Sequence, residues 1–214
     1  FNLIAWYSKN KNMNKTFLIG IPVRDFVNPM SRLSNLLTAD ERIQLSKNLI
    51  LNLKNVFSDQ ETALYIISNS PEVSLFCKSN NLEIFQSSKS GLNEEVKQFI
   101  NLVNNYKYWT IVHGDLPYIT KHYANVWKKL CKSKKIVITE SKDRGTPIFG
   151  GNLKFNNFTY GKNSFLEHMK VIQDMSVEAE KVFHKEFYFE LDDEADYEEF
   201  LKNKPRWYTK LNNV

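Results

Sequence analysis

The sequence predicts a single α/β domain with a mainly parallel, mixed sheet flanked by helices. Apolar runs of four or five residues recur along the chain, as is typical of strands covered on both faces. Amphipathic helical segments separate these runs, which favours right-handed crossovers between parallel strands. Turn residues follow several of the runs, and a length of 214 residues fits one domain rather than two.

Expected strands and helices alternate most clearly in the first part of the chain, up to Thr139. Its expected strands are residues 17–23, 63–67, 82–85, 109–112 and 135–139. Its expected helices follow Thr38 as far as Phe57, begin at Ser70-Pro71, and cover 94–106 and 119–131. Thr38 and Glu41 have the spacing of a capping box, with Thr38 as the N-cap. We expect residues 24–34, between the first strand and the first helix, to be irregular.

The pattern changes after Thr139. Residues 140–147 form a polar loop, and residues 149–155 suggest a strand interrupted by Gly150-Gly151. Asn163-Ser164 is expected to cap a helix that continues to about Met175. A last strand is expected at 186–192 and a last helix at 194–201.

The composition limits the functional class. The formal net charge of +5 suits a polyanionic partner, but the basic residues are scattered and do not indicate a nucleic-acid stripe. Cys77 and Cys131 are expected to be reduced core cysteines of a cytoplasmic protein. No apolar run reaches the roughly 20 residues that a membrane span needs, so no membrane partner is expected.

The two ends of the chain are expected to lie outside the domain. Met13 is followed at once by Asn14-Lys15 and a strand, so we interpret Met13 as the natural start. Residues 1–12 would then be a non-native or disordered extension, 13–204 the domain, and 205–214 a C-terminal tail.

Carboxylates at predicted strand ends are the first candidate site. Asp115 follows an apolar strand that Pro117 stops, and ligands of open α/β sheets bind beyond the carboxyl ends of strands. Glu190 and Asp192 lie two apart in the last predicted strand and would point to one side. If the two strands are close, three carboxylates converge, as a Mg²⁺ site requires. Alternatively, the acidic run from Asp192 to Glu194 only charges the start of the last helix.

Two further segments could bind anions. Arg24, Ser31 and Arg32 follow the first strand, where α/β proteins often hold phosphates. That loop lacks the glycine-rich phosphate motifs, so a solvated basic loop is at least as good an interpretation. Gly161 and Ser164 open a helix whose N–H groups could bind an anion, or form an ordinary N-cap. His113 and His168 are interpreted as supporting residues.

Six segments in order resemble the 2-phospho-L-lactate guanylyltransferases of deazaflavin-coenzyme biosynthesis. They are Ile21-Pro22-Val23-Arg24 through Glu41-Arg42, Gly91-Leu92-Asn93, Gly114-Asp115-Leu116-Pro117, Asp143-Arg144-Gly145-Thr146, Tyr160–Phe165 with His168, and the acidic segment at 190–192. The resemblance covers about residues 17–201 and implies a GT-A-like, Rossmann-related nucleotidyltransferase. Such an enzyme transfers GMP from GTP to a small phosphorylated acid (2-phospho-L-lactate, phosphoenolpyruvate or 3-phosphoglycerate) and releases pyrophosphate.

The resemblance also implies a role for each matching position. Asp115, Arg24 and Arg32 would be catalytic, and Asp115, Glu190 and Asp192 would hold one or two Mg²⁺ ions. The residues matching the acceptor site are Thr146, Gly161 and Ser164. Those assigned to the nucleotide are Pro22, Val23, Arg24, Ser31, Arg32, Gly91, Asn93 and Gly114.

The chain departs from the family pattern at several of these positions. Met30 stands where a lysine is usual, and Arg24 replaces another lysine. Pro147 replaces an asparagine, which removes an amide side chain and a backbone donor. Glu190 replaces an aspartate and keeps the carboxylate. These departures leave the nucleotide and the acceptor less certain than the class of reaction.

Other functions stay open from sequence alone. The chain could be a nucleotidyltransferase for another nucleotide or acceptor, a glycosyltransferase, or a noncatalytic nucleotide-binding protein. A nucleic-acid binder would use the basic tail from Lys204, with Trp207 and Tyr208 stacking on bases, although packing of both rings on the domain is the simpler interpretation. The oligomeric state also stays open, with a homodimer compatible with the sequence.

Overall fold

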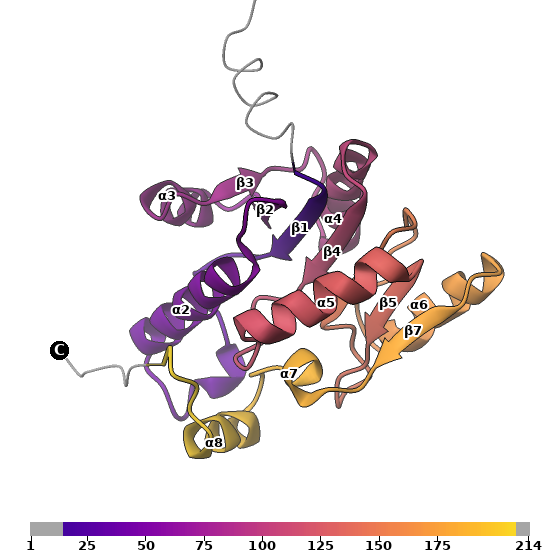
Figure 1. Ribbon diagram of the computed structural model, residues 1–214. Helices are drawn as coiled ribbons and strands as arrows, with labels where there is room; N and C mark the ends of the chain where they lie inside the picture. The colour runs from indigo at the N-terminus through magenta and orange to yellow at the C-terminus, as the bar shows by residue number, and fades with distance from the viewer. Residues whose placement is uncertain (1–14, 209–214) are drawn as a thin grey trace, which may run out of the picture.

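The fold is one seven-stranded sheet, seen in a computed structural model that describes residues 15–208 (Figure 1). The strand order is β3-β2-β1-β4-β6-β5-β7. All described pairings are parallel except those of β6, which runs antiparallel between β4 and β5. The strands are β1 (Phe17–Pro22), β2 (Thr62–Ile67), β3 (Glu83–Phe85), β4 (Tyr108–Val112), β5 (Ile136–Thr139), β6 (Ile148–Gly151) and β7 (Ala179–Val182). The mixed, mainly parallel sheet confirms the predicted fold class; the predicted extension at 1–12 lies outside the described residues.

Helices cover both faces of the sheet (Figure 1). They are α2 (Ala39–Phe57), α3 (Pro71–Ser79), α4 (Leu92–Ile100), α5 (Lys121–Ser133), α6 (Ser164–Asp174), α7 (Lys185–Tyr188) and α8 (Glu194–Lys202), with 3₁₀ turns η1 (Ser31–Leu33) and η2 (Asn101–Asn105). Helices α2 and α5 pack through one apolar cluster, and α4 and α6 through a second. The result is a three-layer domain whose sheet is buried on both faces.

Local sequence signals fix several elements. The Thr38 hydroxyl accepts a hydrogen bond from the backbone N–H of Glu41, and the Glu41 carboxylate accepts one from the backbone N–H of Thr38 at 2.8 Å, so the predicted capping box is confirmed. Pro71 opens α3 after the N-cap Ser70, also as predicted. At Gly20 an added Cβ would lie 2.5 Å from the Phe99 ring, so this glycine allows α4 to pack directly on β1.

The predicted last strand at 186–192 is wrong. The chain instead forms edge strand β7 at Ala179–Val182, then the single turn α7, and leaves residues 189–193 irregular. Alternating apolar residues suggested a strand, but α7 places Phe187 against the Trp127 ring, 5.4 Å between centroids. The true strand contains Glu180 and Lys181, and this charge, normal for a sheet edge, hid it from an apolar pattern.

Smaller differences concern element ends. The helix predicted at 94–106 begins at Leu92 and continues beyond Ile100 only as the 3₁₀ turn η2. The strand predicted to reach residue 155 stops at Gly151, whose φ of 150° is a backbone conformation that suits glycine. A 3₁₀ turn, η1, lies in the loop that was expected to be irregular.

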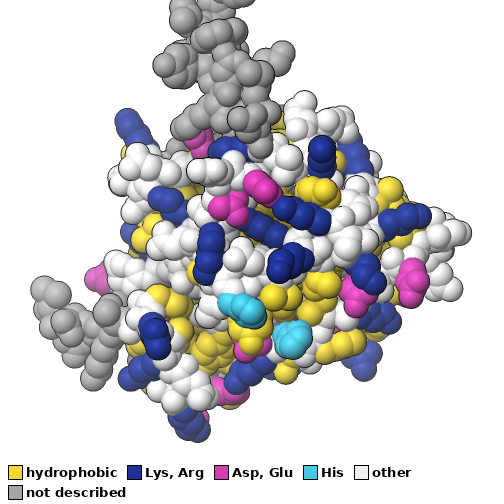
Figure 2. Space-filling view, in the orientation of Figure 1, with side chains coloured by type: hydrophobic (Ala, Val, Ile, Leu, Met, Phe, Trp, Pro, Cys, Tyr) yellow, Lys and Arg dark blue, Asp and Glu magenta, His cyan; other side chains and the backbone are white. Residues whose placement is uncertain are grey.

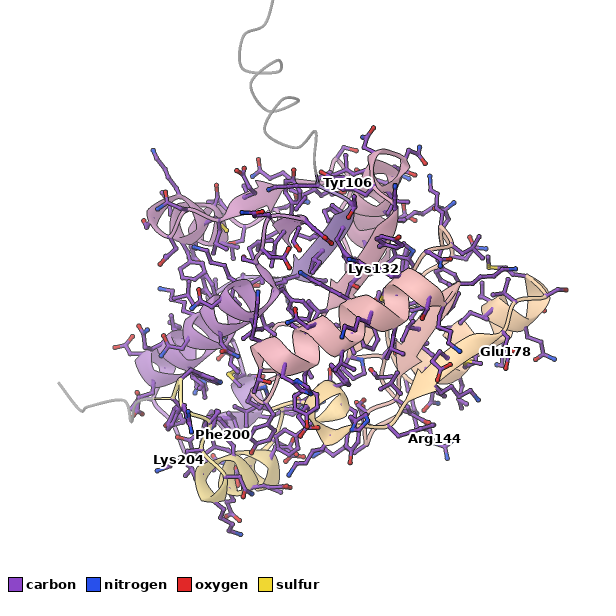
Figure 3. All side chains as sticks on the ribbon, viewed as in Figure 1. Tyr106, Lys132, Arg144, Glu178, Phe200 and Lys204 are labelled. Carbon is purple, nitrogen blue, oxygen red and sulfur yellow. The ribbon has the colours of Figure 1, made fainter. Side chains whose placement is uncertain are left out.

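The described part of the C-terminal segment packs against the domain. Helix α8 packs inward through Phe200 (Figure 3), whose ring lies 4.7 Å from the Tyr208 ring. The Trp207 indole N–H donates to the Pro117 carbonyl at 2.8 Å. Among the helices of residues 15–208, none combines the length and apolarity needed to cross a membrane. On the face in Figure 2, basic side chains are spread over the surface with acidic ones among them.

Candidate active site

A cleft opens where the strand order reverses. Strands β2 and β3 lie on one side of β1 and β4 lies on the other, which makes the carboxyl ends of β1 and β4 the switch point of the sheet. Two adjoining cavities of about 610 and 870 Å³ lie there. Both are lined by the residues that follow β1, Pro22 to Asp25, and by Gly114 and Asp115 after β4.

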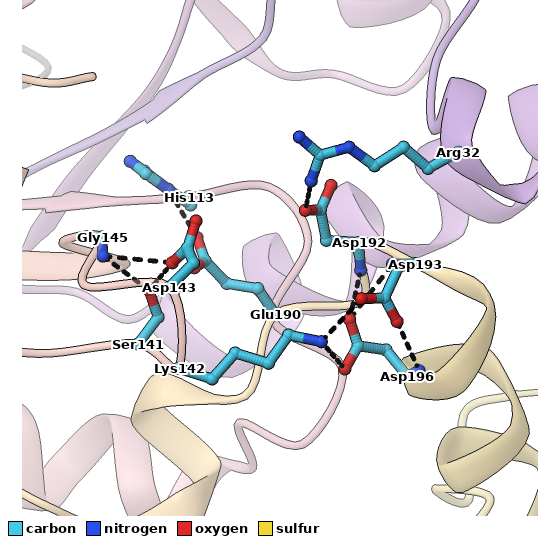
Figure 4. Close-up of polar contacts among 10 residues, drawn as sticks. All are labelled: Arg32, His113, Ser141, Lys142, Asp143, Gly145, Glu190, Asp192, Asp193 and Asp196. Carbon is cyan, nitrogen blue, oxygen red and sulfur yellow. Dashed lines mark hydrogen bonds and ion pairs between the residues drawn. The ribbon is translucent and has the colours of Figure 1, made fainter. Parts of the chain in front are cut away.

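Two carboxylates, Asp115 and Glu190, form a cluster with His113 beside this cleft. Figure 4 shows the contact of His113 with Glu190. The backbone N–H of Leu191 donates to the Asp115 carbonyl at 2.9 Å, which holds the irregular segment after α7 against the end of β4. Glu190 thereby reaches His113, with 2.8 Å between Oε1 and Nδ1. His113, Asp115 and Glu190 each offer a ligand atom, and these three atoms lie within 4.8 Å of one another.

The charges in this cluster shift one another's pKa. The pKa of Asp115 is raised to about 7, chiefly by burial and also by the charge of Glu190, against the opposing effect of His113. Burial lowers the pKa of His113, but the hydrogen bond and charge of Glu190 outweigh it, so the net shift is upward. Asp115 Oδ1 and His113 Nε2 are buried without a hydrogen-bond partner among the described residues. An unpaired buried carboxylate oxygen is costly unless a cation or donor occupies its other side.

Asp192 does not join this cluster. Its carboxylate pairs with the Arg32 guanidinium, while Glu190 turns toward His113 (Figure 4). His113 rather than Asp192 accompanies Asp115 and Glu190 in the cluster, because the segment lacks the strand geometry that would aim Glu190 and Asp192 together. Asp192 lines the same cavity as Asp115, and the site of three carboxylates stays a prediction. The start of α8 has its own acidic cap, in which Asp193 and Asp196 form a capping box and both bind Lys142.

The basic loop that contains Arg24, Ser31 and Arg32 also lines the cleft. The Arg24 side chain is 97% exposed and lies 3.4 Å from the carboxylate of Asp25. Ser31 and Arg32 are exposed as well. Of the positions assigned to the nucleotide, six line the smaller cavity and Gly91 lines the larger one; the six are Pro22, Val23, Arg24, Ser31, Arg32 and Gly114.

Three other predicted site residues, Asn93, Thr146 and Ser164, make internal contacts. Asn93 clamps the backbone of Tyr160 through two hydrogen bonds, of 2.6 and 3.0 Å. The Ser164 hydroxyl donates to Thr146 Oγ1 at 3.1 Å, and Thr146 in turn bonds His168 Nδ1 at 3.0 Å. Thr146, Ser164 and His168 are all buried, so their side chains hold the start of α6 in place. Gly161 lies in the exposed turn before α6, with a φ of 137°.

His113 is the cleft residue that sequence reasoning undervalued. It stands two residues before Asp115, a spacing that places both side chains on one side of an extended chain. That spacing was a usable signal, whereas the contact with Glu190 joins residues 77 apart. Asp143 was likewise missed as a cleft residue; it lines a small cavity with Glu190, and its pKa is lowered chiefly by a hydrogen bond from Ser141.

Three curated proteins are similar to this chain in sequence. A 2-phospho-L-lactate guanylyltransferase from Methanocaldococcus infernus is 31% identical over 153 residues, covering 70% of this chain and 68% of that protein. One from Methanocaldococcus vulcanius is 27% identical over 164 residues, covering 75% and 73%. One from Methanosphaera stadtmanae is 26% identical over 187 residues, covering 84% and 80%.

Solved structures share the fold at low identity. A cytidylyltransferase from Leptospira borgpetersenii has a TM-score of 0.58 at 14% identity, covering 92% of this chain and 88% of that one. A nucleotidyl transferase from Methanothermobacter has a TM-score of 0.58 at 10% identity, covering 88% and 99%. The family model described as "Guanylyl transferase CofC like" matches residues 17–205. The chain therefore belongs to the CofC-like guanylyl transferases, a family of nucleotidyltransferase enzymes.

Proposed function

We propose that this enzyme transfers GMP from GTP to the phosphate of a small phosphorylated hydroxyacid, with 2-phospho-L-lactate as the first candidate. The curated relatives carry that acceptor in their names. The observation that supports the proposal most strongly is that one cavity is lined by both Arg24 and Arg32 and by Asp115, whose carboxylate also belongs to the cluster with His113 and Glu190. Such a cleft suits a nucleotide whose phosphates are shared between a divalent cation and guanidinium groups.

The cluster fits a divalent cation. Asp115 and Glu190 lie close together, and the buried Asp115 Oδ1 has no partner among the described residues. In the proposal Asp192 is a further ligand, freed when Arg32 exchanges this carboxylate for a phosphate. When bound, Mg²⁺ would neutralise the nucleotide phosphates and the leaving pyrophosphate.

The protein's own residues would mainly position the reactants. Arg24 and Arg32 would hold the β- and γ-phosphates of GTP, near backbone supplied by Gly91 and Gly114. A phosphate oxygen of the acceptor attacks the α-phosphorus of GTP, the bond to the bridging oxygen breaks, and pyrophosphate carries away the electron pair. A phosphate nucleophile is already anionic, so no general base is needed, and positioning and charge complementarity would supply the rate.

The acceptor would bind at the start of α6. Because the hydroxyls of Thr146 and Ser164 bond internally, we propose that they fix the backbone around Gly161. The exposed N–H groups of that turn would then contact the acceptor phosphate. We also infer a cytoplasmic location, because Cys77 and Cys131 are both buried and unpaired.

Pyrophosphate release tests the proposal. The purified chain is incubated with Mg²⁺, and in parallel with Mn²⁺, and each of four nucleoside triphosphates, crossed with 2-phospho-L-lactate, phosphoenolpyruvate and 3-phosphoglycerate. We expect release with GTP and one of these acids, and background release without an acceptor. Release with another nucleotide would correct the nucleotide assignment, and no release in any combination would contradict the proposed reaction.

A further inference from the structure

The cluster in the cleft contains a nitrogen donor. His113 is the last residue before the Gly114-Asp115 turn, and its backbone N–H donates to the Pro147 carbonyl at 2.8 Å, which continues the pairing of β4 with β6. The side chain is thereby held beside Asp115 and Glu190. Its other flank lies against the Tyr160 ring, 5.4 Å between centroids. The imidazole is fixed by strand geometry rather than carried on a mobile loop.

The two ring nitrogens of His113 have different surroundings, and both bear on cation binding. Nδ1 contacts Glu190, and Nε2 is buried without a hydrogen-bond partner among residues 15–208. A buried imidazole nitrogen without a partner is costly, as is the unpartnered Oδ1 of Asp115 in the same cluster. A metal ion bound by one ring nitrogen, Asp115 and Glu190 would give the Asp115 oxygen a partner, and it would also satisfy Nε2 where that is the ligating nitrogen.

We infer that His113 is a metal ligand, so that this cleft is a mixed nitrogen and oxygen site that selects a transition-metal dication over Mg²⁺. The inference deepens the proposed function, since it concerns the ion of the same site. Mg²⁺ demands oxygen ligands and retains waters, whereas imidazole suits first-row transition metals. A site of three carboxylates has oxygen ligands alone, which suit Mg²⁺ and Mn²⁺. The histidine at position 113 would therefore determine which metal supports this enzyme.

The rival role for His113 is positioning. A histidine that only holds Glu190 by a hydrogen bond would strengthen the site for every metal alike, without touching the ion. The two roles differ in one measurable property, the presence of nitrogen in the coordination shell. They also differ in whether loss of the ring changes the ranking of metals or only the overall affinity.

Electron spin echo spectroscopy of bound Mn²⁺ tests the ligand directly. Mn²⁺ alone is added to the whole chain and the echo is searched for ¹⁴N modulation. We expect modulation in the wild type and in the control His122→Gln, whose histidine is exposed on α5 and does not belong to the cluster. We expect none in His113→Gln. Bound Mn²⁺ without nitrogen modulation in the wild type, or modulation that survives His113→Gln, would overturn the inference.

Metal affinity supplies the second readout. Titration calorimetry with Co²⁺ and with Mg²⁺ should show that His113→Gln weakens Co²⁺ binding by about tenfold or more, with a much smaller effect on Mg²⁺. Equal losses for both metals would assign His113 to positioning and overturn the inference. Neither experiment contains a nucleotide or an acceptor, so failure of the proposed reaction would show in the pyrophosphate assay and leave this result intact.

Discussion

Two histidines in contact with the Tyr160 ring, half-buried His113 and buried His168, behave in opposite ways. The ring of His113 lies 5.4 Å from the Tyr160 ring, and that of His168 lies 5.0 Å from it. His113 faces the carboxylates of the cleft. His168 faces the Thr146 hydroxyl, the backbone N–H of Thr159 and a group of phenylalanine rings that includes Phe149.

Their pKa values separate accordingly. Burial lowers the pKa of both rings, but the hydrogen bond and charge of Glu190 reverse the shift at His113. His168 has no carboxylate among its partners, and burial lowers its pKa to about 3. The neighbouring carboxylate of Glu190 therefore accounts for the opposite pKa shifts of the two rings. It places His113 in the charged cluster of the cleft, whereas His168 stays a neutral residue of the surrounding core.

The largest expected effect is the loss of turnover when Asp115 of the charged cluster is replaced. Asp115→Asn keeps the shape of the side chain but removes the proposed metal ligand, so turnover should fall by a factor of at least about 10³. The circular dichroism spectrum should be unchanged, because Asp115 bears a buried oxygen that no described group satisfies. Near-normal turnover in a folded variant would contradict the assignment of Asp115.

The next largest effect is a loss of stability when the buried His168 is replaced. His168→Phe removes the partner of Thr146 Oγ1 and of the Thr159 N–H, two hydrogen bonds of 3.0 and 2.9 Å. The Thr159 N–H loses its acceptor at a cost of about 1–3 kcal/mol, and Thr146 Oγ1, which keeps its bond from Ser164, loses a hydrogen bond worth about 0.5–1.5 kcal/mol. Urea unfolding should therefore show a loss of about 2–4 kcal/mol. His122→Gln is the matched control at an exposed histidine and should lie within about 0.5 kcal/mol of the wild type. A change in the free energy of unfolding as small as that of His122→Gln would contradict a structural role for His168.

The pH dependence of stability is the third and smaller effect. With a folded-state pKa of about 3 and an ordinary value of 6.5, His168 binds fewer protons in the folded than in the unfolded chain between these limits. Stability should thus fall as pH drops below 6.5, by up to about 1.4 kcal/mol per pH unit from this residue. Urea unfolding at pH 7, 6 and 5 should show a shallower decline in His168→Gln. Parallel pH profiles for variant and wild type would argue against a neutral, buried His168.

The smallest stability effect belongs to the exposed arginine. Arg32 pairs with Asp192 while its side chain is 67% exposed, so Arg32→Gln should change the free energy of unfolding by less than about 1 kcal/mol. Its proposed phosphate contact predicts a clear rise in the KM for GTP, measured by steady-state kinetics. Arg206→Gln, exposed on the C-terminal segment, is the control that should leave that KM unaltered. An unchanged KM in Arg32→Gln would remove Arg32 from the nucleotide site.

Sequence reasoning succeeded where local chemistry decides the structure. The capping box of Thr38 and Glu41 and the turn after β4 depend on residues within a few positions of each other, and both were predicted. The path of residues 179–192 was not, because α7 forms where Phe187 can pack on Trp127, sixty positions away. The same distance problem hid the contact of His113 with Glu190 and the internal bonding of Ser164.

The central claim is that a phosphate oxygen of the acceptor becomes joined to the α-phosphorus of GTP in this cleft. Phosphorus-31 NMR of a reaction with GTP and 2-phospho-L-lactate tests it directly. We predict two mutually coupled resonances of a new diphosphate bridge, equimolar free pyrophosphate, and neither signal with Asp115→Asn. Orthophosphate as the sole product would contradict the claim, because it would mean hydrolysis rather than nucleotidyl transfer.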